Sequence, residues 1–109
     1  MAYINKIPMK IRQQIMLDGG VRIATLAGAE TWDAYTAHIQ FLDCGGAGRT
    51  ITLPTAADAE GRVFFIANTS DAAEDITITG AITISQNEAG IIASDGTAWD
   101  GFIITGALA

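Results

Sequence analysis

Three short apolar runs between residues 49 and 78 constrain the fold more strongly than any other feature of this chain. In the first run Ile51 and Leu53 alternate with threonines, and in the third Ile76 and Ile78 do the same. Alternation with a period of two, built on β-branched residues, is typical of a strand that buries one face. Polar connections rich in Ala, Asp and Gly separate the runs, and a proline ends the first. The stretch therefore predicts consecutive short strands.

The middle run departs from this alternation because both of its faces are apolar. Phe64 and Ile66 point to one side of the predicted strand, whereas Val63, Phe65 and Ala67 point to the other. A strand with two apolar faces is usually buried on both. Either another sheet of the same subunit or another subunit covers the second face, and the sequence leaves both open. In the second case Val63, Phe65 and Ala67 form a subunit interface.

Further strand and turn signals extend the pattern over the rest of the chain. Residues 21–26 alternate cleanly, Gly80 separates two runs rich in Thr and Ile, and the Asp95-Gly96 pair is a strong signal for a short turn. About seven to nine short strands with little helix indicate an all-β protein. We expect a small antiparallel β-sandwich or barrel-like domain over residues 21–109.

Residues 1–20 are predicted to be a separate, extended N-terminal arm that docks on a partner. Ile7, Ile11 and Ile15 recur every four residues, as on one face of a helix, yet Pro8 fits badly inside a helix. The sequence therefore leaves open whether the arm is a strand or a short helix. The residues expected to dock are Lys6, Ile7, Lys10, Ile11, Arg12 and Ile15.

Charge is divided unequally between the arm and the body. Residues 1–22 carry four cations and one acid, a net charge of +3, whereas residues 23–109 carry two cations and eleven acids, a net charge of −9. The acidic body argues against a nucleic-acid partner, whose phosphates it would repel. No run approaches the roughly 20 apolar residues that cross a bilayer. No secretory signal is recognisable, so we expect no membrane partner and synthesis in a cytoplasm.

The overall composition favours an oligomer. Charged residues make up 17% of the chain and apolar residues 50%, whereas ordinary soluble domains are roughly 25% charged. A chain of 109 residues has a high ratio of surface to volume. So apolar a balance in so small a chain indicates surface that is hidden in an assembly.

Residues suited to catalysis or metal binding are few. His38 is the single histidine and Cys44 the single cysteine, so neither a structural zinc site nor an internal disulfide is expected. Residues 43–50 are rich in glycine, but a predicted strand rather than a helix follows them, so we interpret them as a hairpin loop and not a phosphate-binding loop. The group best suited to a hard cation such as calcium is Asp71, Glu74 and Asp75, without an EF-hand pattern. We expect no enzyme activity, no catalytic residue, no metal and no cofactor.

Four segments together resemble a β-rich module of tailed-bacteriophage structural proteins. They are RTITLP at 49–54, GRVFFIANTS at 61–70, ITI at 76–78 and SDGTAW at 94–99. The module is found in head-decoration (cement) proteins and in fibre or appendage proteins, commonly as homotrimers. The resemblance covers roughly residues 35–105.

The resemblance implies a viral structural protein. We expect a homotrimeric capsid-decoration (cement) subunit, made in the host cytoplasm, that binds the major capsid protein on the outer surface of a bacteriophage head and stabilises it. One alternative is a short tail-fibre or baseplate component. Another is a carbohydrate-binding module for host attachment that uses Trp32, Tyr35 and Trp99.

Overall fold

A computed structural model describes residues 20–105, and within this range the chain forms nine strands and no helix. The strands are β1 (Val21–Thr25), β2 (Glu30–Thr31), β3 (Ile39–Asp43), β4 (Arg49–Thr52), β5 (Val63–Asn68), β6 (Ile76–Ile78), β7 (Thr83–Ile84), β8 (Ala89–Ser94) and β9 (Trp99–Ile104). The predicted all-β class is confirmed for these residues. The predicted arm, apart from Gly20, lies outside them.

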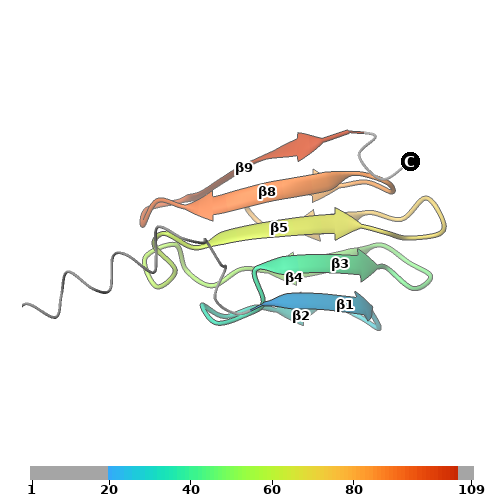
Figure 1. Ribbon diagram of the computed structural model, residues 1–109, viewed down its shortest axis with the longest axis horizontal. Helices are drawn as coiled ribbons and strands as arrows, with labels where there is room; N and C mark the ends of the chain where they lie inside the picture. Colours follow the sequence, from blue (N-terminus) through green and yellow to red (C-terminus); the bar gives the residue numbers. More distant parts are fainter. Residues whose placement is uncertain (1–19, 106–109) are drawn as a thin grey trace, which may run out of the picture.

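The strands form two mixed sheets. Sheet A has five strands in the order β1-β3-β5-β8-β9, and sheet B has four in the order β2-β4-β6-β7. Figure 1 looks onto sheet A, with sheet B behind it. The expectation of antiparallel sheets is wrong, because four of the seven strand pairings between residues 20 and 105 are parallel.

The parallel pairings arise because the chain alternates between the sheets. From β1 to β6 each connection leads to the other sheet, so the next strand of the same sheet runs in the same direction. A parallel pair needs a long crossover, and here a strand of the opposite sheet is part of it. The predicted hairpin loop at residues 43–50 is wrong for this reason, since it joins β3 in sheet A to β4 in sheet B. The turns at Gly80 (φ 78°) and Gly96 (φ 92°) do join paired antiparallel strands, as predicted.

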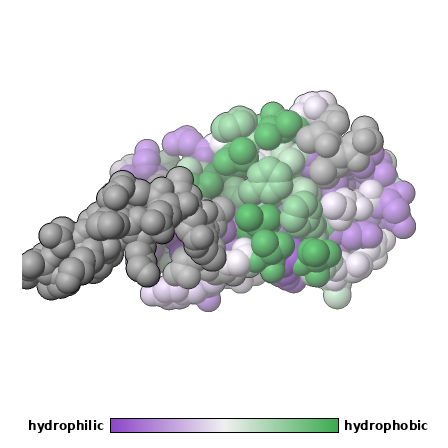
Figure 2. Space-filling model, in the orientation of Figure 1, coloured by the Kyte–Doolittle hydropathy of each residue, from purple (hydrophilic) through white to green (hydrophobic). Residues whose placement is uncertain are grey.

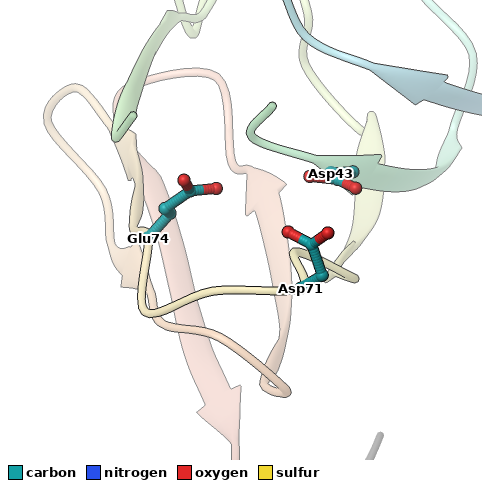
Figure 3. Close-up of side chains that lie close together, drawn as sticks. All are labelled: Asp43, Asp71 and Glu74. Atoms are coloured by element: carbon teal, nitrogen blue, oxygen red, sulfur yellow. The ribbon is translucent and has the colours of Figure 1, made fainter. Parts of the chain in front are cut away.

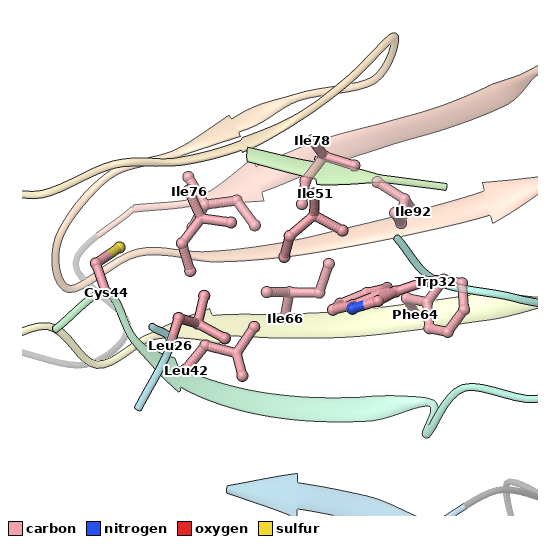
Figure 4. Packing of buried hydrophobic residues seen from close by; sticks show 11 residues of the cluster. Leu26, Trp32, Leu42, Cys44, Ile51, Phe64, Ile66, Ile76, Ile78 and Ile92 are labelled. Atoms are coloured by element: carbon pink, nitrogen blue, oxygen red, sulfur yellow. The ribbon is translucent and has the colours of Figure 1, made fainter. Parts of the chain in front are cut away.

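The facing sides of the two sheets share one hydrophobic core (Figure 4). Ile66 of β5 and Ile76 of β6 are fully buried there. Phe64 is also fully buried, and its ring centroid lies 5.1 Å from that of Trp32 and 5.7 Å from that of Trp99. Burial of a side chain of this size stabilises the fold by about 1.5–3 kcal/mol. The core therefore accounts for one of the two apolar faces of β5.

An ion pair closes the core at the edge formed by β1 and β2. The Nη1 and Nη2 atoms of Arg22 each donate a hydrogen bond of 2.7 Å to the carboxylate of Glu30. The indole Nε1 of Trp32 donates to the same carboxylate over 3.0 Å. The hydrogen bonds from Arg22 hold the pKa of Glu30 below its ordinary value, against the opposing effect of burial. The pair joins sheet A to sheet B.

We predict that Glu30→Gln destabilises the fold at neutral pH by about 0.5–1 kcal/mol, because it removes a partly exposed ion pair. A carboxylate with a lowered pKa stabilises the folded state above its unfolded pKa and loses this effect as pH falls through the folded pKa. The difference between variant and wild type in urea unfolding should therefore shrink in acid. Glu60→Gln, at an exposed position, is the control. A penalty that is unchanged in acid would contradict the assignment.

Candidate assembly interface on the outer face of sheet A

The outer face of sheet A is apolar across all five strands. Two rows of cross-strand neighbours make up this surface, here named the sheet A patch. The first row is Val21, Ile39, Phe65, Ile91 and Phe102, and the second is Ile23, Phe41, Ala67, Ala89 and Ile104. Figure 2 shows this face as a band of hydrophobic residues across the middle of the molecule, with hydrophilic residues towards its ends.

The patch is most exposed at its two edges. Ile23 and Val21 on β1 are 81% and 57% exposed, and Phe102 on β9 is 60% exposed. In the middle, Ala67 and Ala89 are fully buried. Phe41 and Phe65 are half-buried, and their ring centroids lie 6.3 Å apart. Five strands with two outward side chains along each give a projected area on the order of 300 Å². The largest apolar patch on a soluble monomer is often of about this size, and such a patch is often a functional surface.

The predicted interface residues lie on this outer side. Phe65 and Ala67 belong to the two rows, although Ala67 is fully buried, and Val63 pairs with Ala93 beside them. Sheet B packs on the opposite side of β5, the side of Phe64. No second sheet formed by residues 20–105 covers the Phe65 side. Among residues 20–105 the first of the two explanations that the sequence left open, another sheet of the same subunit, is therefore not found, and the second, another subunit, stays a prediction.

Strand β1 turns its larger aliphatic side chains outwards. Its apolar Val21 and Ile23 alternate with Arg22 and Ala24, so an isolated reading buries the first pair and exposes the arginine. In the structure Arg22 reaches Glu30, while Val21 and Ile23 face outwards. This orientation leaves two large aliphatic side chains in contact with solvent unless a partner covers them.

The outer face of sheet B has a different composition. Its exposed residues are threonines, namely Thr31, Thr50, Thr52, Thr77 and Thr83. Threonine combines β-propensity with a hydroxyl group that water can solvate. A hollow at the β6–β7 turn, lined by residues 77–83, contains no charged side chain. The outer face of sheet B is thus polar, whereas the outer face of sheet A is apolar in its two rows.

The predicted docking residues of the arm cannot be placed on either face. Lys6, Ile7, Lys10, Ile11, Arg12 and Ile15 all lie outside the described residues.

A cluster of carboxylates lies at one end of the sheet A patch. Oxygens of Asp43, Asp71 and Glu74 lie within 4.8 Å of one another (Figure 3). The sequence grouped Asp75 with Asp71 and Glu74, but the structure brings Asp43 into the group instead. Asp43 comes from β3 and the other two from the β5–β6 connection. The Oε1 atom of Glu74 is buried and receives no hydrogen bond from the described residues.

The single histidine and the single cysteine of the sequence both take part in internal hydrogen bonds. His38 is buried, with Nδ1 2.7 Å from the carbonyl oxygen of Val63. The Oγ of Ser70 accepts a hydrogen bond of 2.8 Å from the backbone N–H of Cys44.

The indole groups also have internal roles. Trp32 is 4% exposed, and Trp99 donates its N–H to the carbonyl oxygen of Pro54 over 2.8 Å. Trp32 is therefore not available as a platform for a sugar ring.

In the part of the chain that the structure describes, no helix has the length and apolar character needed to cross a membrane. Comparison with known proteins found no matching family model, no similar curated protein and no similar solved structure.

We predict that Phe65→Asp leaves the subunit folded and weakens its self-association at least about 30-fold, because a buried unpaired carboxylate is costly at an interface. Analytical ultracentrifugation measures the association, and circular dichroism the fold. Thr77→Asp, which adds the same charge to the outer face of sheet B, should associate as the wild type does. If Phe65→Asp unfolds the monomer instead, the Phe65 face belongs to the interior of the subunit.

We also predict that divalent metal is not required for folding. Carboxylates are common at protein surfaces, and the cluster of Asp43, Asp71 and Glu74 lies at the end of the sheets rather than in the core. Melting temperatures with and without a chelator should agree. A loss of several degrees on chelation, abolished by Asp71→Asn, would contradict this expectation.

Proposed function

We propose that this protein is a structural subunit of a tailed-bacteriophage virion, without enzyme activity. Its specific role in this proposal is capsid decoration: a homotrimer binds the outer surface of the head and stabilises the shell. The observation that carries the proposal is the sheet A patch, a five-stranded apolar face on a small acidic subunit. The resemblance of residues 35–105 to virion modules supplies the class of assembly.

The proposed mechanism is mechanical. Copies of the subunit join through the sheet A patch, and the trimer then holds neighbouring capsid proteins together. A ligand that binds only the assembled shell stabilises it by mass action. A stable protein interface buries roughly 800 Å² on each partner, so the contact with the shell needs surface beyond the patch that joins the copies.

The arm is the proposed source of that surface. Residues 1–22 carry a net charge of +3 and the rest of the chain −9, so the arm differs in sign from its own body. Three arms on one trimer engage a shell together, and weak single contacts become tight through effective concentration. The charges of Lys6, Lys10 and Arg12 then guide the encounter. The apolar side chains of Ile7, Ile11 and Ile15 prolong the residence time on the shell.

One observation favours a second role for the same interface, as a short tail-fibre or baseplate component. Strands β1, β3 and β5 stack in parallel, as do β2, β4 and β6 on the other side. Stacking of this kind lengthens a structure along one direction, as in solenoid proteins. Cryo-electron microscopy of virions separates the two roles, since decoration places the subunit on the head and the alternative places it on the tail.

We predict that deletion of residues 1–18 leaves a folded β-rich oligomer that no longer coats its shell. The deletion removes the arm and none of the nine strands. Cosedimentation with shells that lack the protein measures the binding, and circular dichroism the fold. Normal occupancy by the truncated protein would contradict the role of the arm.

A charge variant serves as the companion to this deletion. Neutral residues in place of Lys6, Lys10 and Arg12 should weaken binding more at low salt than at high salt, because salt screens exposed charges. If the charge variant loses the same fraction of shell binding at both salt concentrations, the loss comes from altered side-chain packing and not from the missing charges.

A further inference from the structure

We infer that two further copies of this chain cover the sheet A patch, joined head to tail so that the β1 edge of one copy contacts the β9 edge of the next. The inference rests on the proposed structural function and specifies the partner of the same surface. Three copies then enclose a channel-free apolar core, with the three A sheets as its walls and the three B sheets outside.

The distribution of exposure points to contacts between unlike edges. The most exposed apolar side chains stand at opposite sides of the patch, Val21 and Ile23 on β1 and Phe102 on β9. The residues between them, such as Phe65, are already half-covered by their neighbours. A contact that brings β1 of one copy against β9 of the next covers both exposed edges. Such a head-to-tail contact is heterologous and forms a ring when the rotation closes.

The dimensions of the sheet fit a ring of three. Five strands spaced at about 4.8 Å make a wall about 24 Å wide. A triangle with sides of about 24 Å has its centre about 7 Å from each wall, close to the half-spacing of about 5 Å between packed sheets. Large side chains such as Phe41 and Phe65 extend far enough to fill this space. The ring therefore buries the patch without leaving a wide pore.

The chemistry of the patch selects a copy of itself over other occupants. Its two rows contain no charged side chain, so a partner must present an uncharged apolar surface or bury an unpaired charge. The same patch on another copy meets this requirement. Residues 1–19 are a poorer match, because cations separate Ile7, Ile11 and Ile15. On a helix these three isoleucines would span about 12 Å, half the width of the patch.

A ring of this kind has an electrostatic cost at one end. Three-fold symmetry brings the three copies of the Asp43, Asp71 and Glu74 cluster to the same end of the assembly, and a trimer of chains with charge −6 carries −18. Added salt screens this repulsion and does not weaken the apolar contact. The structure therefore implies that salt strengthens the assembly.

Cysteine cross-linking of the full chain tests the arrangement. Val21→Cys and Phe102→Cys lie in the same row at opposite edges, so head-to-tail contact places them together across copies. Mild oxidation of the double variant should yield a covalent trimer on a non-reducing gel. Thr31→Cys with Thr83→Cys, on the outer face of sheet B, should remain uncross-linked. Wild-type protein controls for Cys44, which is buried.

Native mass spectrometry of the untreated wild-type chain gives the copy number, and the trimer fraction should rise with salt in sedimentation experiments. A covalent dimer alone would overturn the ring in favour of two sheets packed face to face. A monomer at all concentrations would overturn self-association and assign the patch to another occupant, such as residues 1–19. Failure of cross-linking in a protein found on phage heads would sink only this inference, whereas a covalent trimer absent from virions would sink only the proposed function.

Discussion

Strand β5 carries apolar side chains on both faces, and the rest of the structure depends on where those two faces go. Sheet B covers the side of Phe64 and Ile66, where the core forms between the sheets. A layered domain buries one side of each sheet against the other, so two layers leave Phe65 on the outside. The apolar outer side of sheet A also contributes to the low fraction of charged residues in the chain. The outer side of sheet A carries apolar residues at positions where an isolated two-layer domain usually carries polar ones.

The two outer faces show that this composition is specific to one side. Sheet B presents threonines such as Thr50 and Thr77 to solvent, whereas the two outer rows of sheet A consist of Val, Ile, Phe and Ala. The alternation of Thr with Ile51 and Ile76 sets the inside and the outside of sheet B without a partner. In sheet A the inner side is settled by the same rule, and the outer side is apolar as well. The proposed assembly, with sheet A turned inwards and sheet B turned to water, would satisfy both patterns at once.

The positions of the strands were predicted better than their pairing partners in the sheets. Local alternation located the strands around Ile51 and Ile76, and the turns at Gly80 and Gly96 joined paired strands as expected. The antiparallel arrangement and the hairpin at residues 43–50 were wrong, because the chain passes to the other sheet after each of its first five strands. Contacts between segments far apart in the sequence decide which sheet a strand joins. Such contacts cannot be predicted from a short window of residues.

The candidate interface was predicted in part for the same reason. The run around Phe65 predicted a second apolar face, because both faces of one strand can be read from consecutive residues. Phe102 joins the patch only through the pairing register across five strands, which its local sequence does not contain. Strand β1 is the clearest case. Its pattern alone would bury Val21 and expose Arg22, but Glu30 holds the guanidinium on the core side with two hydrogen bonds of 2.7 Å. Since β1 can bury only one face inside the described body, the ion pair on the core side leaves Val21 and Ile23 on the outer side.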